Sequence, residues 1–550
     1  MNDQRRWLHI LFKSIAAAAS GVMLYAAFPP LSDVPSAWIA FIPVLIVFRF
    51  SSPAIAFKYG YLSGLVFWLL SLSWLISLHK TGTTMLFATL GWLSVSFYAA
   101  IYNGLFGVAA SLLMRLEKRE WWWKILLVLL IPASWSGLEY IRSMLLTGFS
   151  WNQLGVSQFS NLAVIQCAEV GGVYMVSAVL MILNSALVLT GLSVYEVYRK
   201  RQKSKRIRYE LMTGLLCCLI VMAWGGRALE KNRIMQESTV ELKLAIVQPN
   251  TPQLKKWNPD YERDLLDRLH KQTVLAAMSK PSLIIWPETA VMRAYNKDEL
   301  TQEFVGGLAE RGSPILVGAM ERMRVDETDD EYKNWQFFNS SFQVMTNGVV
   351  AANYRKQHLV PFGEYIPLES IIPPLKKIMP LGFSCTPGKE SVLMTCDGLP
   401  FSVLICFEDS FPGIARKAVK EGAVFLVNQT NDAWFDGTAA PIQHMSHCVF
   451  RAVENRVPIV RAANSGVSCF ISRSGGISYL QSDKNKYGLM VEGFKLSSIM
   501  VDNPLEYKTV YSRYGDMVFG IPCALFVFGL FAFAAVRTRL RTKTGEKHDD

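Results

Sequence analysis

The stretch FSVLICFEDSFPGIARKAVKEGAVFLVN, residues 401–428, determines the fold class of the second half of this chain. Residues 401–406 and 424–428 are apolar runs of strand length, and residues 414–421 between them have the spacing of a helix. Alternation of strand and helix predicts an α/β domain, in which sites lie beyond the carboxyl ends of the strands.

The same alternation extends outward from this stretch over residues 238–510. We expect strands at 240–247, 283–286 and 315–319, a helix over 259–278, and a hairpin of strands 337–344 and 348–354 around Asn347-Gly348. These elements predict one α/β domain with boundaries at 238 and 510.

The sequence on both sides of this domain has its apolar residues gathered in blocks. The 550 residues are 51% hydrophobic and 18% charged, with a mean hydropathy of +0.23, which excludes a disordered chain. A helix needs about 20 apolar residues to cross a hydrocarbon core. We therefore expect a membrane bundle of about seven helices over 1–229, a further helix at 516–536 and a basic tail at 537–550. The eight expected spans lie near 8–28, 36–50, 56–78, 84–114, 122–147, 168–196, 209–226 and 516–536, and the second and seventh are short.

Lysine and arginine cluster on alternate connections between these spans. They precede the first span, follow the second, fourth and sixth, and follow the last: Arg5, Arg6, Arg49, Lys58, Arg115, Lys118, Arg119, Lys124, the basic residues of 199–208 and those of 537–547. Because basic loops stay in the cytoplasm, this pattern puts both termini there and the 238–510 domain on the opposite side. The net charge of +12 is thus a topology signal, and we expect no nucleic-acid partner.

Three reactive side chains stand at expected strand ends. Glu288 follows the run LIIWP, Cys406 follows FSVLI, and Lys356 follows the second hairpin strand. A thiol is a weak nucleophile until it is deprotonated; a carboxylate can take its proton, and an ammonium group lowers its pKa. The same ammonium, with the backbone N–H of Phe407, can stabilise the oxyanion of a tetrahedral intermediate. The three residues predict a nucleophilic cysteine enzyme if the fold brings them together.

Four motifs in this half of the chain resemble a known family. They are WPE at 286–288, YRKQHLVPFGEYIP at 354–367, LICFED at 404–409 and NQTNDAWF at 428–435. They are similar to those of the nitrilase superfamily, which uses a Glu-Lys-Cys triad in an αββα sandwich. The PFGEYIP and NDAWF forms, and spans on both sides of the domain, resemble the apolipoprotein N-acyltransferases, membrane-bound members of that superfamily.

The resemblance implies a role for each matching position. Glu288 is implied as general base, Lys356 as oxyanion and electrostatic partner, and Cys406 as nucleophile. Further carboxylates of the family site match Glu364 and Glu408, and aromatics of its substrate loops match Trp257 and Trp434. The family often has Tyr after the nucleophile, where this chain has Phe407, so the backbone N–H is kept and a phenol hydroxyl is not.

The activity that the resemblance implies is acyl transfer through a Cys406 thioester. A phospholipid donates the acyl chain, and the acceptor is the α-amino group of the N-terminal S-diacylglyceryl cysteine of an apolipoprotein. The implied location is the bacterial inner membrane, with a periplasmic catalytic domain and cytoplasmic termini. We expect no cofactor and no metal, since no Cys/His spacing fits zinc.

The amino-terminal half carries the resemblance in FPP at 28–30, FSWNQLGVSQ at 149–158 and Trp135, Glu139 and Arg142. Glu139 and Arg142 lie one helical turn apart within the fifth span. Charges in a membrane are costly and face protein or water. We expect these two to pair with each other, the alternative being direct contact with a lipid head group.

Three other functions stay open at this point. A membrane-anchored nitrilase-type amidase shares the catalytic residues and differs in giving the acyl group to water. A Cys-His hydrolase is a rival mechanism because His444 and His447 follow Cys406 in the sequence. A transporter or scaffold with an inactive domain is the third, although such a domain has no reason to keep Glu288, Lys356 and Cys406 together.

Two further expectations concern the α/β domain. Cys385 and Cys396 flank a Thr-Pro-Gly turn, and a disulfide between them is possible in an oxidising compartment. An apolar, Pro-interrupted loop at 371–383 is a candidate for dipping into the outer leaflet of the membrane; the alternative is a loop that packs between domains.

Overall fold

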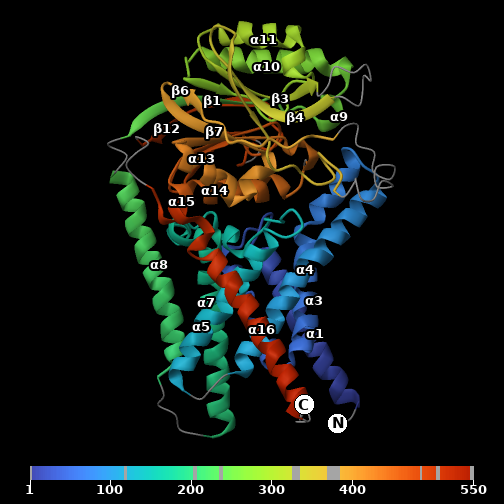
Figure 1. Ribbon diagram of the computed structural model, residues 1–550, viewed down its shortest axis with the longest axis vertical. Coiled ribbons are helices and arrows are strands. Elements are labelled where there is room, and N and C mark those ends of the chain that lie inside the picture. Colours follow the sequence, from blue (N-terminus) through green and yellow to red (C-terminus); the bar gives the residue numbers. More distant parts are fainter. Residues whose placement is uncertain are drawn as a thin grey trace. The chain divides into compact units, whose positions relative to one another are not determined.

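The computed structural model describes residues 3–116, 120–201, 207–234, 239–324, 335–367, 384–435, 437–483, 486–502 and 508–544 (Figure 1). The chain divides into two compact units. The helical unit comprises Met1–His79, Thr83–Glu230 and Tyr514–Asp550, and the α/β unit comprises Lys80–Gly82 and Lys231–Arg513. The domain boundaries expected from the sequence remain predictions, and the apolar loop at 371–383 lies outside the described residues.

Long apolar helices make up the helical unit. Within the described residues, seven are long and apolar enough to cross a membrane. These are α1 (Asp3–Ala26), α3 (Pro53–Ser71), α4 (Met85–Arg115), α5 (Trp121–Arg142), α7 (Ala168–Arg199), α8 (Tyr209–Ile234) and α16 (Gly520–Thr544), and the unit also contains the short helices α2 (Ile42–Arg49) and α6 (Leu162–Ile165).

The second expected span, 36–50, forms a 3-10 turn (Val34–Trp38) and then α2, whose 8 residues are about 12 Å long. This segment runs back along α1. The backbone N–H of Val44 donates to Ser20 Oγ at 3.0 Å, and Lys13 Nζ donates to Ser51 Oγ at 3.1 Å. The chain therefore reverses direction between α1 and α3, as a bundle of eight alternating spans requires.

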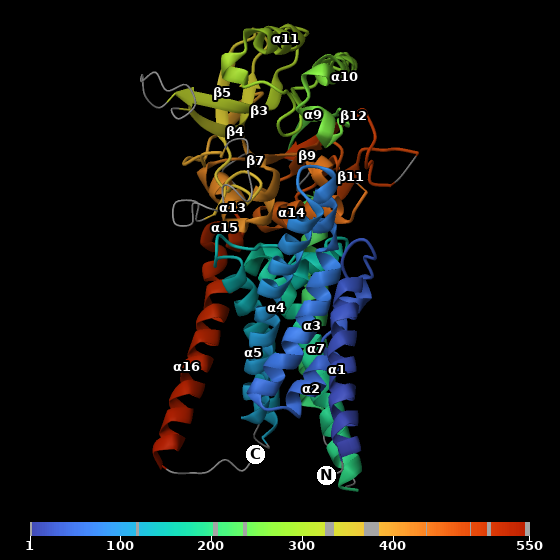
Figure 2. The ribbon, with the colours of Figure 1, turned by 90° about the vertical axis from the view of Figure 1, so that its right-hand side faces the viewer.

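The long helices of this unit and α2 alternate in direction along the chain (Figures 1 and 2). The amino ends of α1, α3, α5 and α8 and the carboxyl ends of α2, α4, α7 and α16 lie at one end of the unit (Figures 1 and 2). Arg49, Arg115 and Arg199 occupy the last turns of α2, α4 and α7 and are thus at this same end. Hydrogen bonds between consecutive helices are consistent with these directions. They are Ser111 Oγ to Ser51 O (2.8 Å), Trp92 Nε1 to Leu69 O (3.0 Å), Lys124 Nζ to Ser193 Oγ (2.6 Å), Tyr174 Oη to Ser143 Oγ (2.8 Å) and Trp224 Nε1 to Glu169 Oε1 (3.2 Å).

The expected pairing of Glu139 with Arg142 is wrong. Glu139 Oε1 accepts the backbone N–H of Leu154 at 2.7 Å, and Arg142 donates from Nη1 to Trp151 O at 2.9 Å. The Arg142 guanidinium also lies over the Trp68 ring, 4.6 Å from its centre. No ion pair joins the two side chains in the described structure, because both are used to hold the loop that follows α5.

The strands of the α/β unit form two sheets. The first has the order β12-β1-β2-β3-β4-β5, with β1–β2–β3 parallel; the second has the order β11-β10-β9-β8-β7-β6, with β7–β8–β9 parallel. Strands of the first sheet are β1 (Val240–Gln248), β2 (Leu283–Ile285), β3 (Ile315–Arg324), β4 (Trp335–Val344), β5 (Val350–Arg355) and β12 (Gly493–Val501). Strands of the second are β6 (Met394–Cys396), β7 (Leu399–Ile405), β8 (Phe425–Thr430), β9 (Ile459–Ala463), β10 (Cys469–Ile471) and β11 (Ile477–Tyr479).

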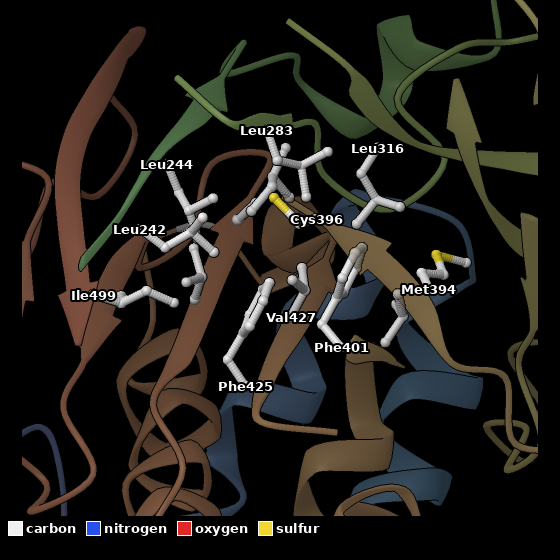
Figure 3. Close-up of a cluster of buried hydrophobic side chains, with 14 of the residues drawn as sticks. Leu242, Leu244, Leu283, Leu316, Met394, Cys396, Phe401, Phe425, Val427 and Ile499 are labelled. Atoms are coloured by element: carbon white, nitrogen blue, oxygen red, sulfur yellow. The ribbon is translucent and has the colours of Figure 1, made fainter. Parts of the chain in front are cut away.

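The apolar faces of the two sheets pack against each other. Figure 3 shows this core, where Leu244 and Leu283 of the first sheet meet Phe401, Phe425 and Val427 of the second. A second cluster lies between the first sheet and helices α10 (Glu262–Ala277) and α11 (Glu299–Ala309). Helices α13 (Pro412–Glu421) and α14 (Ala440–Asn455) contact strands of the second sheet. The order helix, sheet, sheet, helix confirms the expected αββα sandwich.

The possible disulfide is absent. Cys385 and Cys396 are both buried free thiols. Cys396 belongs to the core between the sheets, whereas Cys385 packs with Met320 and Leu359. The two thiols therefore belong to different apolar clusters, which explains why proximity in sequence does not bring them together.

Candidate active site

Three strand ends carry the reactive residues expected from the sequence. Glu288 follows β2, Lys356 follows β5, and Cys406 follows β7. Gln429 of β8 joins the two sheets near this point, because its Nε2 donates to Trp286 O at 2.7 Å. The sandwich thus brings residues from both sheets to one site.

The carboxylate of Glu288 is held from two sides. Its Oε1 accepts from Asn339 Nδ2 at 2.7 Å, and its Oε2 accepts the backbone N–H of Asn431 at 2.8 Å. Only 6% of the residue is exposed. Lys356 Nζ lies 3.4 Å from Oε1. Glu288 is therefore oriented by fixed donors and has a cation at the same oxygen.

The ammonium group of Lys356 lies between two carboxylates. Its Nζ is 3.0 Å from Glu364 Oε1 and 2.9 Å from Oε2, in addition to its contact with Glu288. Burial alone would lower the pKa of Lys356, but Glu364 and then Glu288 outweigh it and raise the pKa well above the ordinary value. Asn339 Nδ2 also donates to Glu364 Oε1 at 2.8 Å, so one amide joins the two carboxylates. Lys356 is a permanent cation in this site.

Cys406 occupies a tight turn. The sequence places it at the end of a strand; the structure places it first in the 3-10 turn Cys406–Ser410, with a φ of 52°. This left-handed conformation is unusual for a residue other than glycine and is stored strain typical of functional turns. Asn428 Nδ2 donates to Cys406 O at 3.2 Å, and Arg461 Nη1 donates to Asn428 Oδ1 at 2.5 Å. A buried arginine thus holds the nucleophile turn through one amide.

The thiol of Cys406 is protonated at rest. Burial raises its pKa well above the ordinary value, Glu288 raises it further, and Lys356 and a hydrogen bond from Thr430 lower it. Lys356 lowers the pKa of the thiol, as expected, but burial, Glu288 and Asp432 together outweigh its effect. The thiol therefore needs a base at the moment of attack, and of the two carboxylates coupled to it, Glu288 has the larger effect.

Glu408 lies two residues after Cys406 in the sequence, but its side chain is used to hold the backbone. It is fully buried, and its oxygens accept the backbone N–H groups of Ile405 at 2.7 Å and Gln357 at 2.6 Å and the hydroxyl of Tyr354 at 2.9 Å. Burial raises its pKa to about 7, against the lowering effects of the backbone donors and of Lys356. Its carboxylate joins the Cys406 turn to the end of β5 and is not directed at a reacting group.

The aromatic residues expected at the site lie on surface segments. Trp257 follows the short helix α9 (Gln253–Lys256) and is 43% exposed, and Trp434 lies in the turn Asp432–Phe435 and is 36% exposed. Phe407 packs edge-on against Phe411 and its ring is near that of His358. Its backbone N–H belongs to the first residue after the nucleophile.

Sequence reasoning missed three residues of this site. Asn339 of β4 and Asn431 after β8 orient Glu288, and the ammonium of Lys256 donates to Glu288 O at 3.0 Å. Asn431 lies within the motif NQTNDAWF, which was a signal. Asn339 and Lys256 gave none, because an amide in a strand and a lysine beside another lysine are ordinary residues of a solvated surface.

His444 and His447 belong to a buried network on α14. His444 has its Nδ1 2.9 Å from Asp432 Oδ1 and its Nε2 3.1 Å from Asp409 Oδ1, so both ring nitrogens face aspartates. Burial lowers its pKa, as does Arg461, whose Nη2 lies 2.9 Å from Nδ1, but Asp409 and Asp432 outweigh both and raise the pKa to about 9, so the ring is an imidazolium. Burial lowers the pKa of His447 to about 3. A charged imidazole held by two carboxylates is a poor base for Cys406, which weakens the Cys-His alternative.

Each of the two units matches a known protein family. Residues 20–186 match the apolipoprotein N-acyltransferase N-terminal domain family, and residues 243–498 match the carbon-nitrogen hydrolase family. The apolipoprotein N-acyltransferase of Geobacter metallireducens is 32% identical over 540 residues, which cover 96% of this chain and 96% of that protein.

The chain belongs to the apolipoprotein N-acyltransferase family.

Two further members have similar coverage. The enzyme of Gloeobacter violaceus is 29% identical over 94% of this chain and 93% of its own, and that of Methylococcus capsulatus is 30% identical over 91% and 92%. Like the other members of the family, the chain is an acyltransferase with a nitrilase-type catalytic domain, and it is a bacterial multi-pass membrane protein.

Proposed function

We propose that the chain transfers an acyl chain from a phospholipid, through a thioester on Cys406, to the α-amino group of the N-terminal S-diacylglyceryl cysteine of apolipoproteins. The observation that carries this proposal is the cluster of Glu288, Lys356 and Cys406, in which a fixed carboxylate and a permanent cation are coupled to one protonated thiol. Family membership supplies the substrate class.

In the first half-reaction the thiol attacks the phospholipid ester. Glu288 takes the proton of Cys406 as its sulfur bonds to the carbonyl carbon. The carbonyl oxygen becomes an oxyanion, which Lys356 and the backbone N–H of Phe407 stabilise; one such donor contributes about 3–4 kcal/mol in comparable sites. Glu288 then returns the proton to the leaving alcohol, and the products are a lysophospholipid and the thioester.

In the second half-reaction the α-amine attacks the thioester. The carbonyl oxygen again becomes an oxyanion next to Lys356 and Phe407. The sulfur leaves from the tetrahedral intermediate, and Glu288 carries a proton from nitrogen to sulfur, which restores the thiol. A thioester reacts readily with amines, and an apolar environment keeps water from it.

Exposed apolar side chains on the segments around the site support lipid substrates. Leu254 and Trp257 on the α9 segment are 70% and 43% exposed, and Phe362, in the loop that carries Glu364, is 47% exposed. Large apolar residues at this exposure are costly in water unless they meet an apolar partner. An acyl chain or a diacylglyceryl group is such a partner.

The proposal includes a location. Arg49, Arg115 and Arg199 lie at one end of the helical unit, which we assign to the cytoplasmic side together with both termini. The catalytic domain then faces the periplasm of the bacterial inner membrane, where both lipid-anchored substrates are present.

A transfer assay with two possible acyl acceptors tests this function. The purified protein is incubated with phospholipid labelled in its acyl chain and with a diacylglyceryl-cysteine peptide whose amino group is free. We expect label in the peptide amide and an equal amount of lysophospholipid. A matched peptide with an acetylated amino group should receive none. Release of the label as free fatty acid with no amide would favour the nitrilase-type hydrolase.

A further inference from the structure

In the second half-reaction the acceptor nitrogen loses two protons, and Glu288 transfers only one of them. The acceptor is an α-amine, whose ordinary pKa of about 7.7–8.0 makes it mostly an ammonium ion at neutral pH. Attack needs the free amine, so the ammonium must first lose one proton. A second proton leaves nitrogen after attack and passes through Glu288 to the departing sulfur. Overall, the acyl thioester and the ammonium ion give the amide, the thiol and one released proton. This released proton needs an acceptor of its own.

Lys256 is a buried lysine beside the catalytic base. Only 2% of it is exposed, and its Nζ donates to the backbone carbonyl of Glu288 at 3.0 Å. Within the described residues no carboxylate lies within ion-pair distance of it, whereas Lys356 has Glu364 and Glu288. Two lysines at one site thus have opposite environments.

The position of Lys256 is built into the site. Its helix α9 is tied to the segment after β8, since Asn431 Nδ2 donates to Gln253 Oε1 at 2.9 Å. The backbone N–H of the same Asn431 binds Glu288 Oε2. One residue therefore holds both the loop that carries Lys256 and the catalytic carboxylate, which fixes the Lys256 side chain beside Glu288.

The environment of Lys256 makes it a base at neutral pH. Burial lowers its pKa to about 7, against the weaker effects of Glu288 and Cys406, the titratable groups that face it. With a pKa of about 7, a large share of Lys256 is uncharged when the acceptor amine enters.

We propose that Lys256 is a second proton acceptor of the site, which takes the first proton from the acceptor ammonium and so frees the amine to attack the Cys406 thioester. An N–H bond of the ammonium breaks, its electron pair stays on nitrogen, and a new N–H bond forms at Lys256 Nζ. Lys256 then gives this proton to water. The inference rests on the proposed function and adds to it a separate base for the second half-reaction.

Single-turnover reactions of preformed acyl-enzyme test this role. Lys256→Met removes the base, and Lys256→Arg keeps a cation and a donor that stays protonated. In both variants the acyl-enzyme is first formed from phospholipid and isolated, so that deacylation is measured apart from any effect of the substitution on acylation. Aminolysis by the diacylglyceryl peptide at pH 7 should fall by about 100-fold, and in Lys256→Met it should recover toward pH 9, where the amine is already free. Hydroxylamine, which is uncharged at neutral pH, should deacylate all forms equally. Lys255→Met, at the exposed neighbouring lysine, is the control.

The outcomes separate the possibilities. Wild-type aminolysis in Lys256→Arg, or equal slowing of hydroxylamine and peptide in Lys256→Met, would overturn the role of Lys256 as a base and leave a structural one. Failure of the wild-type protein itself to form an acyl-enzyme from phospholipid would instead contradict the proposed function.

Discussion

The carboxylate of Glu408 accepts the backbone N–H of Gln357 at 2.6 Å, which joins the turn of the nucleophile to the strand end of the catalytic lysine. The same carboxylate accepts the N–H of Ile405, directly before Cys406. Lys356 is the residue before Gln357. One buried carboxylate thus joins the backbone beside the thiol to the backbone beside the ammonium.

Replacement of Glu408 by Gln should slow acyl-enzyme formation and destabilise the protein. The amide NH2 of the new side chain would face a backbone N–H, and an unsatisfied buried donor costs about 1–3 kcal/mol. We expect a rate loss of about tenfold or more, measured by lysophospholipid release. Tyr354→Phe, which removes one donor to Glu408 and leaves its carboxylate, is the matched variant and should lose less. Equal rates for Glu408→Gln and the wild-type protein would contradict the positioning role.

Lys356 can be tested apart from its structural effect. Lys356→Met leaves Glu288 and Glu364 without their shared cation, and removing one partner of a buried ion pair costs about 3–5 kcal/mol of stability. The double variant Lys356→Met/Glu364→Gln removes one of the two carboxylates and should regain part of that stability. Activity should stay absent in both, because the oxyanion donor is missing. Thermal unfolding and phospholipid turnover measure the two effects, and recovery of activity in the double variant would show that Lys356 is only structural.

The sequence was enough to predict which catalytic residues lie at strand ends. It was not enough to predict the residues that orient their side chains. Glu288 and Cys406 follow apolar runs and Lys356 follows the second strand of a hairpin, so the sequence pattern places all three at strand ends. That these edges meet depends on the packing of two sheets, which no local pattern encodes. Asn339 is one polar residue in a mostly buried strand, and its contact with two carboxylates follows from the register of β4 with β5. The Glu139–Arg142 pairing failed for a similar reason, since helical spacing does not reveal a loop that folds back onto both side chains.

The His444 network predicts a pH-dependent stability. The folded-state pKa of His444 is about 9, above the ordinary 6.5, so its contribution is complete below pH 6.5 and is lost as pH rises through 9. The difference in unfolding free energy between wild type and His444→Gln should therefore shrink over this range, by at most about 3 kcal/mol. His447→Gln is the control, because His447 is uncharged in both states above pH 6.5 and its difference should stay constant. A constant difference for His444→Gln would contradict the charged form.

Close packing of α5 against α16 gives a prediction in the helical unit. A Cβ on Gly137 would lie 2.4 Å from the backbone oxygen of Cys523, whereas a Cβ on Gly529 of α16 meets nothing within 4 Å. Small residues allow such close approach between helices in a membrane. Gly137→Ala should lower the thermal midpoint in detergent by an overpacking cost of about 1–3 kcal/mol, and Gly529→Ala should not lower it. An unchanged midpoint for Gly137→Ala would contradict this contact.

The central claim is that the acyl chain passes through Cys406. The direct measurement is the intact mass of the protein after incubation with phospholipid and no acceptor, followed by peptide mapping. We predict the mass of one acyl chain on the peptide that contains Cys406, its release by hydroxylamine, and its absence in Cys406→Ala. An acyl group on another residue, or lysophospholipid formed with no acyl adduct on the protein, would contradict the account.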